Sequence, residues 1–428
     1  MIDRYALSPM RELWTLAAQY DRWLEVELAA LEAMESLREV PAGTSEAVAK
    51  RVRVDLPRIA AVEADVHHDL LAFLRVLEDQ AGAPGRFVHQ GLTSSDIKDT
   101  ALSLQMRDGL DLLLAEIDAL RAVLLAQART HQDLVMVGRT HGMHAEPTTL
   151  GLKLLGWMQR LDRDRGRLDE AREAIAVGKL SGPVGTYTQV SPQVEALVCS
   201  RLRLRPALVP GQIIARDRHA QVLAAIAIAG GTLEQIALEI RHLSRTEVDE
   251  LEEPAPEGSS SMPHKRNPIT SERICGLSRI LRANLQATLE DLALWHERDM
   301  SHSSVERVVV PDSFLLLHYL LVEARGLVAG LVVRPERIAQ NLALTQGRIH
   351  SQTLLIALLK AGMPRARAHE AIEAASQRAA QSGTDLLSAL RDDPALADTL
   401  PEGWFDEEAL FDRVRGTSRR LIGQADST

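Results

Sequence analysis

Apolar residues recur along most of the chain at the spacing of three to four positions that is typical of an amphipathic helix. The clearest case is 94–130, which contains no proline and follows Thr93 with hydroxyl and carboxylate side chains suited to a helix start. We predict one helix there, about 55 Å long at 1.5 Å per residue. Its apolar positions are Leu102, Leu110, Leu113, Leu114, Ile117, Leu120 and Leu124.

Three further long helices are predicted over 147–175, 215–246 and 268–297, and a proline stands near the start of the first and the last. Helices of this length are usually held against one another in a bundle. Segments 180–190 and 205–214 are rich in Gly, Pro and β-branched residues, so we expect loops or short ribbons there.

Three domains are expected on this pattern. Residues 1–92 should form a small helical domain, 93–340 a domain of long helices, and 341–428 a helical cap interrupted at Gly362-Met363-Pro364. Aromatic residues make up only 3% of the chain, whereas Ala, Leu and Arg are abundant, and this balance favours helix over sheet. The predicted fold class is therefore all-α.

Composition and charge disfavour several kinds of ligand and partner, which are nucleic acid, a metal ion and a membrane. The formal net charge of −10 disfavours a nucleic-acid partner. The two cysteines, Cys199 and Cys275, match neither a disulfide scaffold nor a zinc site, so we expect no metal and a reducing compartment. No uncharged apolar run reaches the roughly 18 residues of a membrane span, and no signal-like core follows the charged N-terminus. A cytoplasmic protein without membrane contact is expected.

The densest chemistry lies at 258–268, which reads Gly-Ser-Ser-Ser-Met-Pro-His-Lys-Arg-Asn-Pro. The start of the helix predicted after it offers unpaired N–H groups and a positive dipole end, both of which favour an anion. Lys265 and Arg266 add full positive charges. An ordinary serine-rich loop before a helix is the alternative, and the density of matched groups disfavours it.

This segment resembles the loop GSSxMPxKxNP of the fumarase/aspartase superfamily. The histidine at position 264 is similar to the residue found there in the adenylosuccinate lyase branch. Other segments of the chain resemble GRTHGxHAEP, HxGLTSSD, the HHD triplet and WHERDISHSSVER of the same lyases, and they lie at 139–147, 87–96, 67–69 and 295–307. The segment 254–258, which precedes the serines of this loop, is shorter and richer in proline than the KGQKG-type segment usual in the family. Because prolines restrict the backbone, we expect an ordered loop over 255–262.

The resemblance implies a fumarase/aspartase-like fold of three domains with a central long-helix bundle, and a homotetramer whose active sites are shared between subunits. It implies no cofactor. The implied reaction is elimination of fumarate from adenylosuccinate, giving AMP, and from the succinylaminoimidazole carboxamide ribonucleotide. Such an elimination requires a base, an acid and positive charge for the developing dianion. The matching positions are Ser259 as general base, His141 as general acid, Lys265 beside the base, and Glu272 as the partner of His141.

The resemblance also implies a set of substrate contacts. A substrate with one phosphate and two carboxylates needs charged and hydroxyl donors. Phosphate is expected at Arg298, Ser303, Arg307 and His89, and the carboxylates at Thr93, Ser94, Lys265 and Asn267. The remaining matching positions are Arg4, Tyr5, His67, His68, Asp69, Gln212 and Ser260.

Two other functions stay open. A carboxymuconate cycloisomerase of the same superfamily shares the MPHK-type loop, but Arg4-Tyr5, the HHD triplet and the SSVER segment argue against it. A non-catalytic, crystallin-like relative would tolerate loss of site residues. The presence of His141, Ser259 and Lys265 argues against that role.

Overall fold

Helices dominate the computed structural model, which describes residues 2–254, 257–258, 261–393, 396 and 405–426. The predicted all-α fold class is confirmed. The chain divides into two compact units. Unit 1 comprises Met1–Ala119, Leu161–Glu234 and Ile274–Glu323, and unit 2 comprises Leu120–Arg160, Gln235–Arg273 and Ala324–Thr428.

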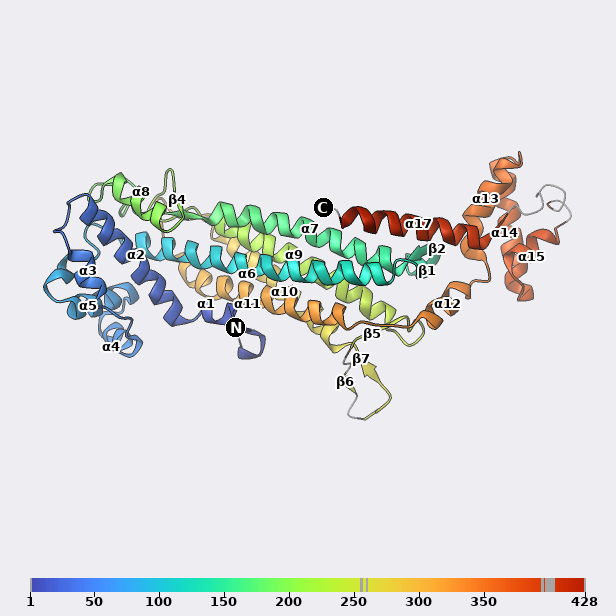
Figure 1. The fold of residues 1–428 in the computed structure, drawn as a ribbon, viewed down its shortest axis with the longest axis horizontal. Helices are drawn as coiled ribbons and strands as arrows, with labels where there is room; N and C mark the ends of the chain where they lie inside the picture. The colour runs from blue at the N-terminus through green and yellow to red at the C-terminus, as the bar shows by residue number, and fades with distance from the viewer. Residues whose placement is uncertain (1, 255–256, 259–260, 394–395, 397–404, 427–428) are drawn as a thin grey trace. The chain divides into compact units, whose positions relative to one another are not determined.

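Each unit contains part of five long helices, which are α6 (Ser94–Thr130), α7 (Leu150–Ile175), α9 (Asp217–Leu243), α10 (Ile269–Glu290) and α11 (Ser301–Ala329). In unit 1 their segments lie side by side (Figure 1) and are joined by polar contacts. Arg165 of α7 pairs with Asp118 of α6, and the Ser278 hydroxyl of α10 donates to the Gly230 carbonyl of α9. Asn284 of α10 donates to Ser313 of α11. Unit 1 therefore contains a helix bundle.

Shorter elements complete unit 1. They are η1 (Asp3–Tyr5), α1 (Met10–Leu13), α2 (Leu16–Ser36), α3 (Thr44–Ala49), α4 (Leu56–Val66), α5 (Asp69–Ala81), η2 (Ala83–Phe87), α8 (Pro192–Arg201) and the parallel pair β3 (Val177–Gly178) and β4 (Arg205–Pro206). Their core is aromatic at its centre, where the rings of Tyr20, Trp23 and Phe73 lie within 5.8 Å of one another. This core fixes α2 and α5 beside the start of α6.

Unit 2 carries three antiparallel pairs, which are β1 (Val135–Thr140) with β2 (Met143–Thr149), β5 (Leu251–Glu252) with β8 (Val332–Val333), and β6 (Glu257–Gly258) with β7 (Arg266–Asn267). Its further helices are α12 (Pro335–Ala343), η3 (Arg348–His350), α13 (Ser351–Lys360), α14 (Arg365–Ser382), α15 (Leu386–Arg391) and α17 (Glu407–Ala425). Helices α13 to α15 enclose a separate apolar cluster that includes Leu354, Leu358 and Leu390. The interruption predicted at Gly362-Met363-Pro364 separates α13 from α14.

The predicted helices agree with the structure to different degrees. The helix over 94–130 is confirmed, and the most buried of its predicted apolar positions are Leu110, Leu113, Ile117, Leu120 and Leu124. The helices expected over 215–246 and 268–297 are shorter, at Asp217–Leu243 and Ile269–Glu290. The expected helix 147–175 begins only at Leu150, since Pro147 belongs to β2.

Among the elements that were not predicted are the β1–β2 hairpin and α11. The β1–β2 hairpin has no strict alternation of apolar and polar residues, and α11 contains Pro311, which interrupts the usual helical signal. Of the segments expected to be loops or short ribbons, 180–190 contains no strand and 205–214 contains only Arg205–Pro206, which pairs with Val177–Gly178. The domain boundaries at 92 and 340 stay a prediction.

Helix α9 is long and apolar enough to cross a membrane by length and composition. However, 56% of its most apolar window is buried within the structure. That burial is typical of a core helix of a soluble protein.

Candidate active site

The serine-rich loop of unit 2 is anchored on both sides. Backbone pairing joins Glu257–Gly258 to Arg266–Asn267, drawn in yellow in Figure 1. Before the loop, the buried carboxylate of Glu253 accepts from the backbone N–H groups of Thr270 at 3.1 Å and Ser271 at 2.7 Å. The expectation that the start of α10 is left for an external anion is therefore wrong, because Glu253 already occupies these donors.

Lys265, Asn267 and Glu272 are brought together in unit 2. They line a cavity of about 760 Å³ with His264 and Arg266. Within the described residues, Lys265 makes no ion pair, and its side chain lines this cavity. Ser259 and Ser260 lie outside the described residues. The prediction of an ordered loop over 255–262 also falls partly outside them, at 255–256 and 259–260.

His141 lies in unit 2 at the tip of the β1–β2 hairpin. His141 and Gly142 join the paired residues Thr140 and Met143, and their φ angles are 55° and 77°. Positive φ at both central positions is the geometry of a type I′ turn. The turn leaves the imidazole exposed, whereas Arg139 anchors the strand behind it.

The anchor is a two-point contact with a buried carboxylate. Arg139 donates from Nη2 to Glu250 Oε1 at 2.6 Å and from Nη1 to Oε2 at 3.0 Å. Glu250 is fully buried and precedes β5, and Asn341 donates to it at 2.9 Å. His141 and Glu272 share no hydrogen bond among the described contacts of this single chain, so their pairing stays a prediction.

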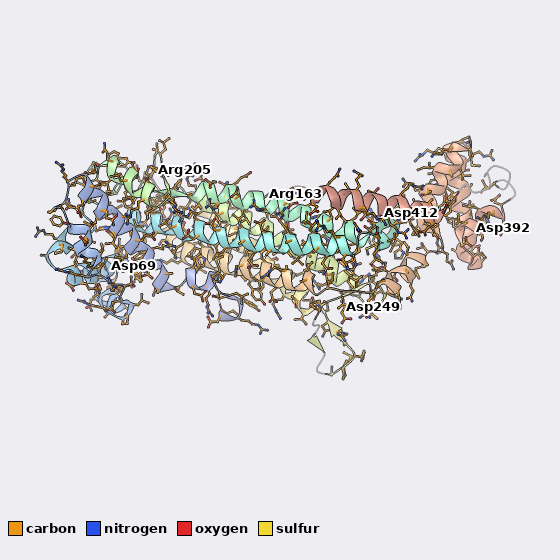
Figure 2. The ribbon with its side chains drawn as sticks, viewed as in Figure 1. Asp69, Arg163, Arg205, Asp249, Asp392 and Asp412 are labelled. Carbon is orange, nitrogen blue, oxygen red and sulfur yellow. The ribbon has the colours of Figure 1, made fainter. Side chains whose placement is uncertain are left out.

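Asp69, labelled in Figure 2, is the centre of a charged group in unit 1. Lys98 Nζ donates to its Oδ1 at 2.5 Å, and Arg307 Nη2 donates to its Oδ2 at 2.6 Å. Burial alone would raise the pKa of Asp69, but the two cations and the Leu70 N–H lower it to about 2. Asp69 is therefore an ionised residue that joins α5 to α6 and α11.

The three predicted histidines of unit 1 differ in their environments. His89 is mostly buried, and its Nδ1 lies 2.6 Å from Oε1 of the buried Glu27. Burial disfavours the charged ring, yet the hydrogen bond and charge of Glu27 raise the pKa of His89 above its ordinary value. His68 caps α5 through Nδ1, which accepts from the Leu71 N–H at 3.2 Å. His67 is exposed beside it at the end of α4.

Thr93 and Ser94 stand at the start of α6, where the buried carboxylate of Asp96 holds the backbone of Thr93. The Thr93 N–H donates to Asp96 Oδ2 at 2.8 Å, and the Asp96 N–H donates back to the Thr93 carbonyl at 2.9 Å. The other oxygen of Asp96 pairs with Lys179, and both of these side chains are fully buried. The backbone at the start of this motif is therefore tied to a buried ion pair whose second member, Lys179, lies outside the motif.

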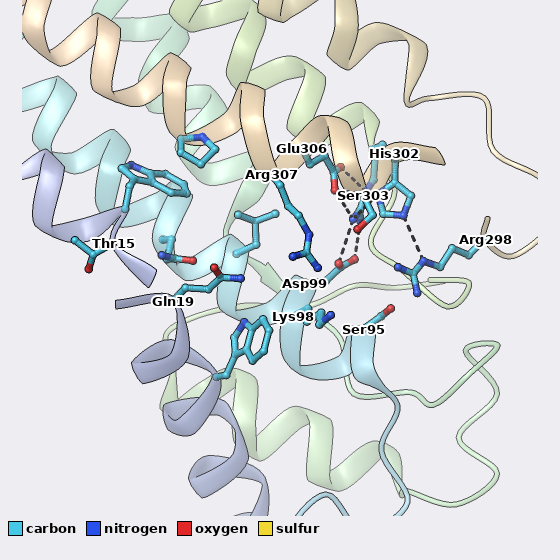
Figure 3. Close-up of a pocket in the computed structure, with 16 residues that line it drawn as sticks. Thr15, Gln19, Ser95, Lys98, Asp99, Arg298, His302, Ser303, Glu306 and Arg307 are labelled. Atoms are coloured by element: carbon cyan, nitrogen blue, oxygen red, sulfur yellow. Dashed lines mark hydrogen bonds and ion pairs between the residues drawn. The ribbon is translucent and has the colours of Figure 1, made fainter. Parts of the chain in front are cut away.

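Arg298, Ser303 and Arg307 border one cavity of about 280 Å³ together with Lys98 (Figure 3). Arg298 Nη1 donates to Gln212 Oε1 at 3.0 Å, and its Nε donates to His302 Nε2 at 3.3 Å. Burial lowers the pKa of Arg298 from its ordinary value, although a guanidinium remains charged at neutral pH. Four cationic side chains line this space, and Arg216 among them is paired with the carboxylates of Asp99 and Glu306, which also line it. Lys98, Arg298 and Arg307 therefore make the space suited to a small anion.

A buried ionic network lies behind this cavity. The guanidinium of Arg216, only 2% exposed, donates to Asp99 at 2.6 Å and to Glu306 at 2.8 Å. Glu306 Oε2 lies 2.9 Å from His302 Nδ1. Burial would raise the pKa of Glu306, but the hydrogen bond from His302 and nearby positive charge lower it to about 2. Asp99 also accepts from the Ile214 N–H at 2.8 Å.

Arg4 and Tyr5 lie in η1 of unit 1. Arg4 is exposed, and the ring of Tyr5 packs edge-on against that of Tyr319 at 5.2 Å. The structure thus places the predicted residues in two groups. Unit 1 holds the expected phosphate contacts, and unit 2 holds His141 and the residues of the serine-rich loop.

Sequence reasoning missed several residues of the unit 1 cavity. Helical spacing could have suggested Asp99, one turn after Ser95 on α6, and Glu306, one turn after His302 on α11. Nothing in the local sequence pointed to several others, among them Trp14, Gln19, Trp23, Lys98 and Arg216. Among the described residues, no group of three or more His, Cys, Asp or Glu side chains could hold a metal ion.

Two family models match the chain. The model described as "Lyase" matches residues 5–281, and the model described as "Adenylosuccinate lyase C-terminus" matches residues 347–419. The chain is 43% identical to the adenylosuccinate lyase of Thermotoga maritima over 96% of both chains. It is 45% identical to that of Deinococcus radiodurans over 95% of this chain and 96% of the relative. It is also 45% identical to that of Synechocystis sp. over 89% of both.

Solved structures give the same fold. A fumarate lyase from Mesorhizobium sp. superposes with a TM-score of 0.87 at 29% identity, covering 97% of this chain and 99% of the other. A 3-carboxy-cis,cis-muconate lactonizing enzyme from Pseudomonas putida gives 0.86 at 29% identity, covering 99% and 97%. Fold likeness alone therefore does not separate lyases from lactonizing enzymes.

Proposed function

Because the chain belongs to the adenylosuccinate lyases of the fumarase/aspartase superfamily, we propose that it eliminates fumarate from adenylosuccinate, giving AMP. The same elimination from the succinylaminoimidazole carboxamide ribonucleotide gives the carboxamide ribonucleotide. The protein is a carbon–nitrogen lyase of purine nucleotide biosynthesis. The observation that carries the nucleotide assignment is the cavity of unit 1, which Lys98, Arg298 and Arg307 surround with positive charge.

The chemistry is assigned to unit 2. Ser259 removes a proton from the carbon beside a succinyl carboxylate, the C–N bond breaks with its electron pair remaining on nitrogen, and His141 protonates that nitrogen. Lys265 supplies positive charge for the developing dianion, as an unpaired ammonium among the described residues can. Asn267 and Ser260 bind a carboxylate. Glu272 holds the imidazole of His141.

Substrate phosphate binds at Arg298, Ser303 and Arg307. His89 is a further phosphate contact. Thr93 and Ser94 receive a succinyl carboxylate at the start of α6, where helix dipole and N–H groups favour negative charge. Arg4, Tyr5, His67, His68, Asp69 and Gln212 complete the contacts. No cofactor or metal takes part, and no nucleic acid or membrane is a partner of this cytoplasmic enzyme.

The two groups of residues act together in a homotetramer whose sites are shared between subunits. The acid and the phosphate contacts belong to different compact units of the chain, and in a shared site they would come from different subunits. Refolding a mixture of the His141→Ala and Ser259→Ala variants tests this directly, because hybrid tetramers contain some sites with only wild-type contributions. Recovery of part of the activity is expected, whereas no recovery in well-mixed hybrids would assign both residues to one chain.

One assay tests the reaction itself. Purified protein should release fumarate from adenylosuccinate and leave 3-carboxy-cis,cis-muconate unchanged. The second substrate is included because a lactonizing enzyme shares the fold at 29% identity. The match at 347–419 to the adenylosuccinate lyase C-terminus and the identities above 40% favour the lyase. Absence of turnover on either substrate would favour a non-catalytic, crystallin-like role.

A further inference from the structure

We propose that His302 is a positioning residue, which acts by holding the guanidinium of Arg298 at the edge of the unit 1 cavity. This inference rests on the proposed function, in which Arg298 binds the substrate phosphate. His302 is 2% exposed and borders the cavity beside Ser303. Figure 3 shows its ring between Arg298 on one side and Glu306 on the other.

The contacts of the ring determine which nitrogen carries the proton. Arg298 Nε is a donor only, so Nε2 of His302, 3.3 Å away, must accept. Glu306 is ionised and accepts only, so Nδ1, 2.9 Å away, donates to it. Arg216 Nη2 lies farther from Nδ1, at 3.3 Å, and already donates to Asp99 and Glu306. Only the neutral ring with its proton on Nδ1 satisfies both contacts. Protonation of Nε2 would place two donors against each other and release Arg298.

The carboxylate that selects this tautomer cannot move freely. Glu306 accepts from Arg216 through both oxygens, at 2.8 and 3.0 Å. Arg216 donates in turn to both oxygens of Asp99, at 2.6 and 3.1 Å. All three side chains are less than 10% exposed. Asp99, Arg216 and Glu306 therefore form a rigid base under His302, because each buried charge would be left unpaired by a shift of its neighbour.

The result of this arrangement is an oriented cation. Arg298 is held at Nε by His302 and at Nη1 by Gln212, at 3.0 Å. Among the described contacts its Nη2 is unused, which leaves that nitrogen for an anion in the cavity. A guanidinium held at two points loses less conformational entropy when it binds a phosphate than a mobile one. The ring of His302 thus contributes to nucleotide affinity without touching the nucleotide.

Two substitutions distinguish the contributions of the two ring nitrogens of His302. His302→Asn places an amide near the position of Nδ1, so it keeps a donor to Glu306 and loses the acceptor for Arg298. His302→Gln reaches the position of Nε2 and keeps that acceptor. We expect His302→Asn to raise KM for adenylosuccinate about 10-fold, with a smaller change in kcat, as for loss of one hydrogen bond to a charged group. His302→Gln should recover most of the loss.

A double-mutant cycle with Arg298→Ala tests whether His302 acts through Arg298. In that background, His302→Asn should have almost no further effect on KM. Inhibition gives a second readout. His302→Asn should weaken inhibition by AMP, whereas inhibition by adenosine, which lacks the phosphate, should be nearly unchanged. His318→Asn is the matched control, since it removes another buried imidazole from α11 about 24 Å along the helix.

The outcomes separate the two claims. Wild-type protein without fumarate release would refute the proposed function itself. If the wild type is active, two results would overturn only the role of His302. One is additive effects of His302→Asn and Arg298→Ala on KM, and the other is an equal loss of inhibition by AMP and by adenosine in His302→Asn. If His302→Asn fails to fold, His302→Gln still decides, because a 10-fold rise in KM for that variant would contradict the need for an acceptor at this position.

Discussion

Arg307 donates to Asp69 across 2.6 Å, although 238 positions separate the two residues in the chain. This bond joins α11 to the start of α5 and places a guanidinium, 57% exposed, at the cavity of unit 1. Asp69 simultaneously accepts from Lys98 at 2.5 Å. One carboxylate therefore orients two of the four cations that line the cavity.

Acid should weaken the stabilisation that Asp69 provides. Its pKa of about 2 lies below the ordinary value of 3.8, so its contribution is fully present above pH 3.8 and is lost as the pH falls toward 2. The total is about 2 kcal/mol, and about 1 kcal/mol of it should be lost between about pH 6 and pH 3. Urea unfolding of the wild type and Asp69→Asn at both pH values measures this difference. An advantage of the wild type that is constant with pH would contradict the ion pairs.

Lys98→Met should weaken nucleotide binding. The variant removes one positive charge from the cavity and leaves Asp69 paired with Arg307 alone, which holds that guanidinium more firmly to the protein. We expect KM for adenylosuccinate to rise about 3- to 10-fold, the range of one partly buried charge interaction. Lys50→Met removes the same charge from an exposed pair with Glu46 and should leave KM unchanged. Equal effects of both variants would indicate a long-range charge effect only.

His141→Asn should abolish most turnover and preserve the fold. Asn tolerates the positive φ of 55° better than Ala does, so the hairpin keeps its turn while the acid is lost. Loss of general acid catalysis costs roughly 10²–10⁴-fold in kcat. Met143→Ala is the matched control, because Met143 is a neighbouring exposed residue of the same hairpin. Activity of His141→Asn above a tenth of the wild type would remove His141 from this role.

The pair of His89 and Glu27 should stabilise the fold most at acidic to neutral pH. The folded pKa of His89 lies above its ordinary value of 6.5, so the contribution is complete below pH 6.5 and is lost as the pH rises through the folded pKa. Wild type and His89→Gln should therefore differ more in unfolding free energy at about pH 6 than at about pH 9. His369→Gln, at an exposed position of α14, should show no such trend.

Local pattern was sufficient for α6, which carries part of the site, but not for α11, which carries Ser303 and Arg307. The apolar spacing of 94–130 predicts α6 because a helix repeats its buried face every three to four residues, whatever it packs against. Short motifs likewise identify His141, Lys265 and Arg298 as candidates, because each belongs to a run of chemically matched neighbours. The roles of these residues remain predictions that the variants above test.

What the sequence by itself determined was therefore the helical fold class and the residues of the lyase motifs. Only the tertiary structure decided which charges meet: Asp69 with Arg307, Arg216 with Asp99 and Glu306, and Glu253 with the start of α10. It also decided that residues before α7 pair as a hairpin and expose His141 at a tight turn. The physical reason is range. Helical periodicity depends on neighbours within one turn, whereas a buried ion pair depends on how distant segments pack and exclude water.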